Sequence, residues 1–405
     1  MPQLVTQSRS GLRAAALQRK RPSILQVLES TSAGAARFVT DLLLGLDTDR
    51  FDLAFAYSLA RADQKFLDDL DRVRARGIRT YEIPMVRSVR PAADGRAFLQ
   101  LHRLIRHEEF DLVHAHSSKA GFLARLAARS ARPSAVRLYS PHGIAASMNP
   151  VYGYLERLAG WFTDFIVAVS QSEREGLQAR RIVAPRQVVH VTAGIDTAAY
   201  AGYTAPANLR EELGLPPSAV VVGSAGRLVS HKDPFTFLNV AKIVTRARSD
   251  TQFVWIGDGE LREEMTERTR QAGLTDRVKL AGYNPDLRPW MATLDIFMLT
   301  SLSESFGYVT CEAMAMAKPV VGTRVPGTSE LVDHGKTGLL APFRDETALA
   351  EGVLRLVDDQ NMRIRMGRQG RHRAEKLYDL SRMVHDLEEF YWQLLKRRYP
   401  GSRDE

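Results

Sequence analysis

The sequence predicts an α/β protein of two domains, each with a parallel β-sheet covered by helices. Short apolar runs alternate with longer segments of helical spacing along almost the whole chain, which is typical of parallel sheets. Residues 197–217 are rich in glycine and proline, and the alternation restarts after them. At 405 residues the chain is too long for one ordinary core and fits two domains of about 150 to 200 residues.

The composition is that of a globular protein, with 44% hydrophobic and 25% charged residues. No apolar run approaches the roughly 18 to 20 residues of a membrane span, and the residue order of a secretory signal is not found. The single cysteine, Cys311, excludes an intramolecular disulfide and a cysteine-rich metal site. We interpret it as a small buried side chain and expect a reducing, cytoplasmic compartment.

The net charge of +9 indicates an anionic partner: nucleic acid, anionic lipid or a phosphorylated substrate. Much of the excess lies before the first acidic residue, Glu29. Residues 1–22 are therefore expected to form a mobile basic tail, either solvated or a weak amphipathic surface helix. Because aromatic and basic residues do not interleave, contact with an anionic membrane is favoured over nucleic acid.

The N-terminal half, residues 23–200, has the strand and helix order of a Rossmann-like domain. Strands are expected at residues 23–28, 51–57, 80–83, 111–116, 137–140, 165–170 and 188–191. Helices are expected at residues 39–46, 66–77, 98–107, 123–128 and 173–180. The first loop contains Ala33 and Gly34 but lacks G-x-G-x-x-G, so a dinucleotide ligand is disfavoured.

Histidines mark the carboxyl edge of this predicted sheet. His114 and His116 would project from one face of their strand, as a metal pair or as hydrogen-bonded side chains. Because no third ligand is in view, we favour hydrogen bonding and assign no metal. His142 follows another strand and precedes Gly143, which places its imidazole on a tight loop facing whatever this edge binds.

Residues 201–378 repeat the alternation and are predicted to form a second Rossmann-like domain. Strands are expected at residues 219–223, 252–256, 278–282 and 296–299. Helices are expected at residues 235–246, 261–272, 289–293, 347–358 and 362–377, with loop and turn at 326–330 and 335–340. Residues 379–405 are predicted to form a helix capped by Ser381, whose aromatic residues pack across the domain junction.

Residues 301–321 predict a tight loop and a helix, with two glutamates beside the helix N-terminus. Glu304 precedes the helix, and Glu312 lies about one turn inside it. The N–H groups expected at the helix N-terminus, where phosphate binds well, are those of Phe306, Gly307 and Tyr308. Glu312 could accept hydrogen bonds from a ribose diol or lie on a solvated helix face. We favour the first alternative, which predicts a nucleotide diphosphate ligand.

A second group of phosphate-binding candidates lies in residues 223–233. This stretch superficially resembles a P-loop, but the order G-x-x-x-x-G-K-[ST] is absent, so we reject nucleoside triphosphatase chemistry. Arg227 and Lys232 lie five positions apart around a glycine-led turn. They could clamp a diphosphate from two sides.

With these motifs the sequence resembles the retaining glycosyltransferases of family 4, which have the two-domain GT-B fold. In the C-terminal half the resemblance is carried by Gly226-Arg227-Leu228 with Lys232, Gly257-Asp258-Gly259, and Glu304-Ser305-Phe306-Gly307 with Glu312-Ala313-Met314-Ala315. In the N-terminal half, residues 114–121 and 141–143 are similar to members that extend bacterial surface polysaccharides or lipid-linked oligosaccharides. The resemblance implies two Rossmann-like domains whose parallel sheets face each other across a cleft.

The resemblance also implies roles for single residues. Arg227 and Lys232 neutralise the donor diphosphate, Glu312 holds the ribose, and Glu304 contacts hydroxyls of the donor sugar. The implied catalytic set is His142 beside the sugar ring, Glu304, Arg227 and Lys232. Further donor contacts are assigned to Gly257, Tyr283, Phe306, Gly307 and Tyr308. Acceptor contacts are assigned to Ala33, Gly34 and His116.

Three positions depart from the family pattern. Ala33-Gly34 stands where paired glycines are frequent, which would reshape the acceptor pocket. Pro326-Gly327 also stands where two glycines are frequent, and Asp233 follows Lys232 in place of the usual glycine. These last two changes remove no group that the chemistry needs.

The resemblance implies transfer of a hexose or N-acetylhexosamine from a nucleotide diphosphate sugar, with UDP favoured and GDP possible. The expected acceptor is lipid-linked or a polysaccharide, at the inner face of the cell membrane, and no metal or cofactor is expected. Two alternatives remain open: a nucleotide-sugar epimerase of the same architecture, and a non-catalytic nucleotide-sugar-binding protein.

Overall fold

The computed structural model describes residues 21–143, 150–206, 208–396 and 399. The chain divides into two compact units. The N-terminal unit comprises the residues up to Ala168, Glu173–Val191 and the segment from Val384 onward. The C-terminal unit comprises Val169–Ser172 and Thr192–Met383. Nearly all of the expected basic tail, residues 1–22, lies outside the described residues.

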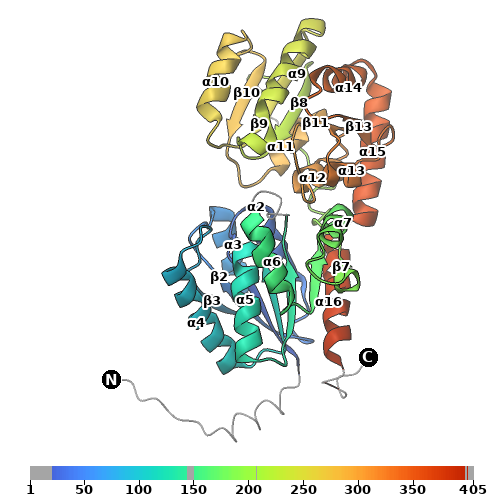
Figure 1. Ribbon diagram of the computed structural model, residues 1–405. Helices are drawn as coiled ribbons and strands as arrows, with labels where there is room; N and C mark the ends of the chain where they lie inside the picture. The colour runs from blue at the N-terminus through green and yellow to red at the C-terminus, as the bar shows by residue number, and fades with distance from the viewer. Residues whose placement is uncertain (1–20, 144–149, 207, 397–398, 400–405) are drawn as a thin grey trace, which may run out of the picture. The chain divides into compact units, whose positions relative to one another are not determined.

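The N-terminal unit contains a seven-stranded parallel sheet in the order β3-β2-β1-β4-β5-β6-β7. Strands β2, β3 and β7 of this sheet are labelled in Figure 1. Its strands are β1 (Ser23–Leu28), β2 (Asp52–Tyr57), β3 (Arg79–Glu82), β4 (Leu112–His116), β5 (Val136–Ser140), β6 (Phe165–Ala168) and β7 (Val188–His190). All seven were predicted, and every end lies within two residues of the predicted one. The order reverses between β1 and β4, and ligands bind at such a switch point in open α/β sheets. There Leu28, His116 and Ser140 lie in one row of the register.

Helices cover both faces of this sheet. They are α2 (Ala33–Gly45), α3 (Gln64–Ala75), α4 (Pro91–Glu108), α5 (Ser118–Ala131), α6 (Pro150–Gly160) and α7 (Gln171–Arg180). Side chains of β2 alternate between the faces: Ala54 and Ala56 join the core under α4 and α5, whereas Phe55 and Tyr57 contact Phe66 of α3. The domain is therefore doubly wound, as predicted.

Two helices of the N-terminal unit differ from expectation. Helix α2 begins at Ala33, so Ala33 and Gly34 form its first turn and not a loop before it. Helix α6 was not predicted, because its sequence begins with proline and contains two glycines. Tertiary bonds hold it instead: Glu156 accepts a hydrogen bond from Arg125 of α5 at 3.0 Å and another from Tyr139 of β5 at 2.7 Å.

The C-terminal unit contains a six-stranded parallel sheet in the order β10-β9-β8-β11-β12-β13. Its strands are β8 (Val220–Ala225), β9 (Thr251–Ile256), β10 (Val278–Gly282), β11 (Ile296–Leu299), β12 (Val320–Thr323) and β13 (Gly338–Ala341). The order reverses between β8 and β11. The loops that follow these two strands, from Gly226 and from Thr300, therefore begin side by side at the carboxyl edge.

The helices of this unit are α8 (Leu209–Glu212), α9 (Pro234–Ala247), α10 (Arg262–Gln271), α11 (Arg288–Thr293), α12 (Tyr308–Ala315), α13 (Pro326–Leu331), α14 (Glu346–Asp358) and α15 (Gln360–Leu377). The last helix, α16 (Leu380–Leu395), begins here, and its residues from Val384 belong to the N-terminal unit.

Three local predictions in the C-terminal half were wrong. Residues 326–330, expected as a loop, form α13, because a proline at the first helical position is favourable and not disruptive. The expected turn at 335–340 runs into strand β13. Ser381 does not cap α16, because its own N–H donates to the carboxylate of Asp379 at 3.0 Å.

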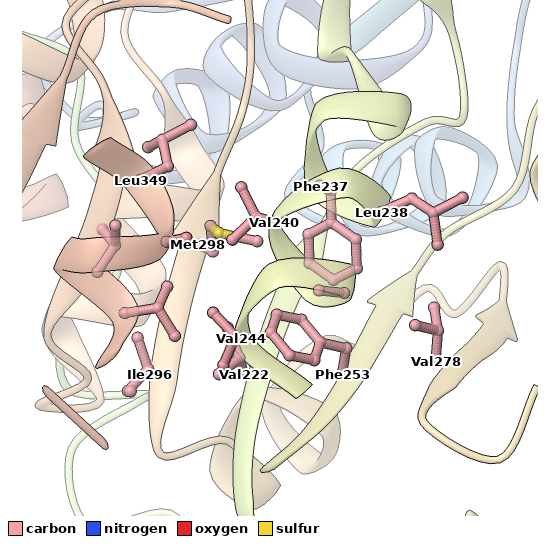
Figure 2. Packing of buried hydrophobic residues seen from close by; sticks show 14 of the residues in the cluster. Val222, Phe237, Leu238, Val240, Val244, Phe253, Val278, Ile296, Met298 and Leu349 are labelled. Atoms are coloured by element: carbon pink, nitrogen blue, oxygen red, sulfur yellow. The ribbon is translucent and has the colours of Figure 1, made fainter. Parts of the chain in front are cut away.

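Apolar side chains from both sides of the β8–β11 switch point form the core of the C-terminal unit. Figure 2 shows Val222 of β8, Phe253 of β9 and Ile296 of β11 beneath Phe237 and Val244 of α9. Each large side chain buried in this way contributes about 1.5–3 kcal/mol of hydrophobic stabilisation. The core thus fixes the strands whose ends carry the loops described next. Among the described residues, no helix is long and apolar enough to span a membrane.

Candidate functional site

Helix α12 begins at a glycine that adopts a left-handed conformation. Gly307 is its N-cap, with φ 94° and ψ 56°, a region that side chains rarely occupy. Gly327 of α13 lets the loop before α12 approach closely, since an added Cβ would lie 2.7 Å from the carbonyl oxygen of Glu304. Phe306 is buried against Tyr308 and Tyr378, so its side chain belongs to the core and only its backbone can face a ligand. The helix N-terminus is thus held in place, and its N–H groups favour an anion.

Lys232 and Glu304 form an ion pair at the β8–β11 switch point. The ammonium nitrogen of Lys232 lies 2.5 Å from Oε1 of Glu304, and the hydroxyl of Ser301 donates to the same oxygen at 2.7 Å. The two charged side chains are only 16% and 10% exposed. Thr300 anchors the lysine by donating to the carbonyl of Lys232 at 3.0 Å. Two residues that the sequence singled out separately are therefore in direct contact.

Glu312 is buried and does not lie on a solvated helix face. It is 2% exposed, and its Oε1 accepts a hydrogen bond from the hydroxyl of Tyr200 at 2.7 Å. Tyr200 was not among the predicted residues, because a tyrosine 112 positions away in a linker gives no local signal. The carboxylate is thereby oriented from the second turn of α12.

The loop that carries Arg227 packs directly on the loop that carries Gly257. The N–H of Gly226 donates to the carbonyl of Ile256 at 2.9 Å. An added Cβ at Gly257 would lie 2.1 Å from the carbonyl oxygen of Gly226. Gly257 also has a φ of 139°, so glycine is required for two reasons. Arg227 itself is exposed and forms no ion pair with any residue that the structure describes.

Tyr283 and His231 complete the set of residues at this edge. The N–H of Gly257 donates to the carbonyl of Gly282 at 2.8 Å, which places Tyr283 beside the loop of Gly257, and Tyr283 is 58% exposed. His231 precedes Lys232 and was not predicted. Burial, together with the charges of Lys232 and Arg227, lowers its pKa, so the ring is neutral near pH 7.

Three histidines of the N-terminal unit belong to one hydrogen-bond chain, in which His114 and His116 are fully buried and His142 is half-buried. Nδ1 of His116 lies 2.9 Å from Nε2 of His142, and Nε2 of His116 lies 2.7 Å from Oε1 of Gln26. The amide of Gln26 donates to the hydroxyl of Tyr391 at 3.1 Å, and this hydroxyl lies 2.6 Å from Nδ1 of His114. The hydrogen bonding expected for His114 and His116 is confirmed.

The hydroxyl of Ser140 fixes which atom donates in each hydrogen bond of this chain. The hydroxyl of Ser140 donates to the carbonyl of Val167 at 3.0 Å, so it accepts from Nε2 of His114 at 2.9 Å. Nδ1 of His114 then accepts from Tyr391, whose oxygen accepts from Gln26.

The hydrogen bonds at the other end of the chain have a fixed direction as well. Because Oε1 of Gln26 can only accept, Nε2 of His116 carries the proton and its Nδ1 accepts from Nε2–H of His142. One tautomer of His142 is thereby selected. Tyr391 and Gln26 were not predicted to take part, because they come from α16 and β1, 365 residues apart.

Burial holds the three rings neutral. Desolvation lowers the pKa of His114 and His116 well below the usual 6.5 and that of His142 to about 3. His116 is fully buried with both ring nitrogens engaged, so it has none left for a direct contact with an acceptor. His142 adopts a left-handed conformation with φ 54° and packs edge-on against Phe38 of α2. The N–H of Gly143 donates to Glu173 at 2.7 Å and closes this loop.

The fold and these two groups of residues define a class: a two-domain α/β protein whose C-terminal unit brings Lys232, Glu304 and the N-terminus of α12 to the carboxyl edge of its sheet. Residues 32–199 match the family model described as Glycosyltransferase Family 4, and residues 207–373 match that of Glycosyl transferases group 1. The chain belongs to the family 4 glycosyltransferases, with the GT-B fold.

Two curated relatives are similar over most of their length. An Escherichia coli protein named UDP-Gal:alpha-D-GlcNAc-diphosphoundecaprenol alpha-1,3-galactosyltransferase is 26% identical over 85% of this chain and 90% of its own. A D-inositol 3-phosphate glycosyltransferase of Corynebacterium efficiens is 30% identical over 64% of this chain and 66% of its own.

Among solved structures, HepE of Anabaena in complex with UDP-glucose superposes with a TM-score of 0.78. It is 23% identical to this chain, and the match covers 92% of this chain and 99% of that one. At this identity the match establishes the fold and nothing about the ligand of this chain.

Proposed function

We propose that this protein is a retaining, metal-independent glycosyltransferase. It transfers a hexose or N-acetylhexosamine from a UDP-sugar to a lipid-linked or polysaccharide acceptor. The observation that carries the proposal is the arrangement at one sheet edge of the C-terminal unit, where Lys232 pairs with Glu304 and Glu312 lies in the α12 helix. The name of the Escherichia coli relative supports a UDP-sugar donor.

In this proposal Arg227, Lys232 and the N-terminus of α12 bind the donor diphosphate and stabilise the charge that develops as it leaves. The bond between the anomeric carbon and the phosphate oxygen breaks, and the acceptor oxygen bonds to that carbon on the same face. The acceptor proton passes to the departing diphosphate. These cationic groups provide the charge stabilisation that a metal ion supplies in other transferases.

The carboxylates take distinct roles in the proposal. Glu312 accepts hydrogen bonds from the ribose diol, with its orientation set by Tyr200. Glu304 exchanges its contact with Lys232 for hydroxyl groups of the donor sugar when the diphosphate engages the lysine. His142 contributes as a neutral ring, since its pKa of about 3 excludes the imidazolium at physiological pH.

The test is a transfer assay with purified protein, nucleotide sugars based on uridine and guanosine, a lipid-linked acceptor and a chelator. Transfer from a UDP-sugar with chelator present supports the proposal, and an absolute need for a divalent metal refutes its mechanism. Incubation without acceptor separates the alternatives. An epimerase would convert the donor sugar, and a non-catalytic protein would bind UDP without turnover in either mixture.

We also propose that the protein works at the inner face of the cell membrane. The net charge of +9 and the diphosphoundecaprenol in the name of the Escherichia coli relative support this site of action. Tyr154 and Leu158 of α6 and the adjacent Trp161 are 65%, 37% and 86% exposed at helical spacing, as interfacial side chains are. Trp161→Ser should weaken sedimentation with anionic liposomes. Equal sedimentation with neutral and anionic liposomes would refute the electrostatic part.

A further inference from the structure

A cavity opens between the loops that follow β2 and β3 in the N-terminal unit. Its volume is about 440 Å³, and it is lined by Ala60, Arg61, Val86, Arg87 and Ser88. Because β2 ends at Tyr57 and β3 at Glu82, the cavity lies at the carboxyl edge of the sheet, the edge that carries His116 and His142. None of its lining residues has a role in the donor chemistry proposed above.

Buried hydrogen bonds hold the two walls of the cavity together. The hydroxyl of Ser58 donates to the carbonyl of Met85 at 2.8 Å and accepts from the N–H of the same residue at 3.1 Å. The hydroxyl of Thr31 donates to the carbonyl of Ser58 at 2.7 Å. On the far wall, the carbonyl of Ser88 accepts from the ammonium of Lys119 at 3.0 Å. The backbones of the two loops are therefore held next to each other.

The walls carry an excess of positive charge. Nη1 of Arg61 lies 3.6 Å from Oε1 of Glu29, a carboxylate that is 3% exposed and directly follows β1. This contact orients Arg61 while it keeps its charge. Arg87 forms no ion pair or hydrogen bond with any residue in the described part of the chain. Lys119 is paired with Asp94 at 2.7 Å. The cavity thus presents two guanidinium groups against one carboxylate.

Two guanidinium groups on two adjacent loops are suited to a phosphate, which arginine binds through paired hydrogen bonds. The two curated relatives named above have phosphorylated molecules in their names, a diphosphoundecaprenol and an inositol 3-phosphate. The residues assigned to the donor diphosphate all belong to the C-terminal unit, whereas this cavity belongs to the N-terminal unit.

We propose that Arg61 and Arg87 form an anion subsite that binds a phosphate group of the acceptor. This inference rests on the proposed glycosyl transfer and narrows its acceptor to molecules that carry phosphate next to the sugar. The subsite sets where the acceptor binds along the sheet edge and takes no part in bond formation.

Kinetics with two matched acceptors test the subsite. One acceptor is a sugar linked to a lipid through diphosphate, and the other is the same sugar linked to the same chain through an ether. Assays run in detergent micelles without phospholipid, so headgroup binding cannot contribute. Arg87→Gln and Arg61→Gln should raise the KM for the diphosphate acceptor by about tenfold or more, because a charge-assisted hydrogen bond is lost. The KM for the ether acceptor and for the UDP-sugar should stay unchanged.

Arg106→Gln is the matched control, an exposed arginine near the end of α4. Arg87→Gln is the decisive variant, because among the described residues Arg87 makes no hydrogen bond or ion pair whose loss could disturb the fold. If Arg87→Gln leaves the KM for the diphosphate acceptor unchanged, or raises it equally for both acceptors, the subsite is refuted.

Binding of inorganic pyrophosphate separates this inference from the proposed function. Calorimetry is done on protein saturated with UDP, so that the donor site is occupied. The wild type and Arg106→Gln should bind pyrophosphate, and Arg87→Gln should bind at least tenfold more weakly. No binding to the wild type, or equal binding to Arg87→Gln, would overturn the subsite. Failure of transfer to every acceptor would instead refute the proposed function. The pyrophosphate titration would still show whether the cavity binds an anion.

Discussion

Nδ1 of His116 lies 2.9 Å from Nε2 of His142, and this contact is the last link of a hydrogen-bond chain that passes through Tyr391 of the C-terminal helix. Tyr391→Phe removes the donor to His114 and the acceptor of Gln26, and with them the selection of one His142 tautomer. We expect kcat to fall about tenfold while affinity for UDP is unchanged. The cost in unfolding free energy is about 1–3 kcal/mol, because buried partners lose their hydrogen bond.

Tyr399→Phe is the control for this prediction, since Tyr399 also donates a hydrogen bond from its hydroxyl, to Asp111 at 2.6 Å. Its kcat should equal that of the wild type. Measured kcat, calorimetric UDP affinity and urea unfolding distinguish the two variants. If the Tyr391 variant keeps wild-type kcat, the chain has no influence on His142.

The buried histidines predict that stability falls as the pH falls. Because the folded-state pKa of His142 is about 3, below the unfolded value of 6.5, the unfolded chain binds a proton first. The free energy of unfolding therefore has its full value above pH 6.5. It declines between pH 6.5 and 3, by up to about 1.4 kcal/mol per pH unit for each histidine. His142→Asn should give a shallower decline in urea unfolding from pH 7 to 4. An equal slope in both proteins would contradict the assignment.

Glu312→Gln should weaken UDP binding by about 10- to 100-fold, because neutral hydrogen bonds to the ribose replace charge-assisted ones. The amide oxygen can still accept from Tyr200, so the fold should be retained. Isothermal calorimetry with UDP measures the change. Glu351→Gln, an exposed glutamate of α14, serves as the control and should bind as the wild type does. Wild-type affinity in Glu312→Gln would remove the ribose assignment.

Gly257→Ala should both destabilise the protein and displace the loop of Arg227. The added Cβ would lie 2.1 Å from the carbonyl oxygen of Gly226, at a φ of 139°. We expect a loss of about 2–4 kcal/mol, from backbone strain of about 1–3 kcal/mol together with the clash. Gly273→Ala is the control, since Gly273 has a φ of 68° and no heavy atom within 4 Å of an added Cβ. Thermal unfolding of both variants measures the loss of stability. An equal loss in the two variants would show that the contact between the loops of Arg227 and Gly257 is unimportant.

Most of both sheets could be predicted from the sequence, because buried parallel strands are short apolar runs whose ends are marked by glycine, proline and polar residues. Helix α6 and helix α13 were missed for the opposite reason: glycine and proline, read as breakers, lie at positions that tertiary packing or a helix start tolerates.

In the candidate site, too, some residues could be predicted from the sequence and others could not. Glu304, Glu312, Arg227 and Lys232 stand in local motifs, so the sequence could indicate them. The partners that orient them could not be predicted. Tyr200 reaches Glu312 across 112 residues, and Tyr391 reaches Gln26 across 365, and no local pattern encodes such contacts.

The ion pair between Lys232 and Glu304 leads to the most direct test of the proposed activity. A UDP-α-hexose, a diphosphate-linked lipid acceptor and a chelator are incubated with the wild type, with Lys232→Met and with Lys242→Met, an exposed control on α9. The anomeric configuration of the product is read by NMR. We predict an α-linked product from the wild type and the control, and a loss of about 100-fold or more in kcat/KM for Lys232→Met. A β-linked product, or wild-type kcat/KM in Lys232→Met, would contradict the account.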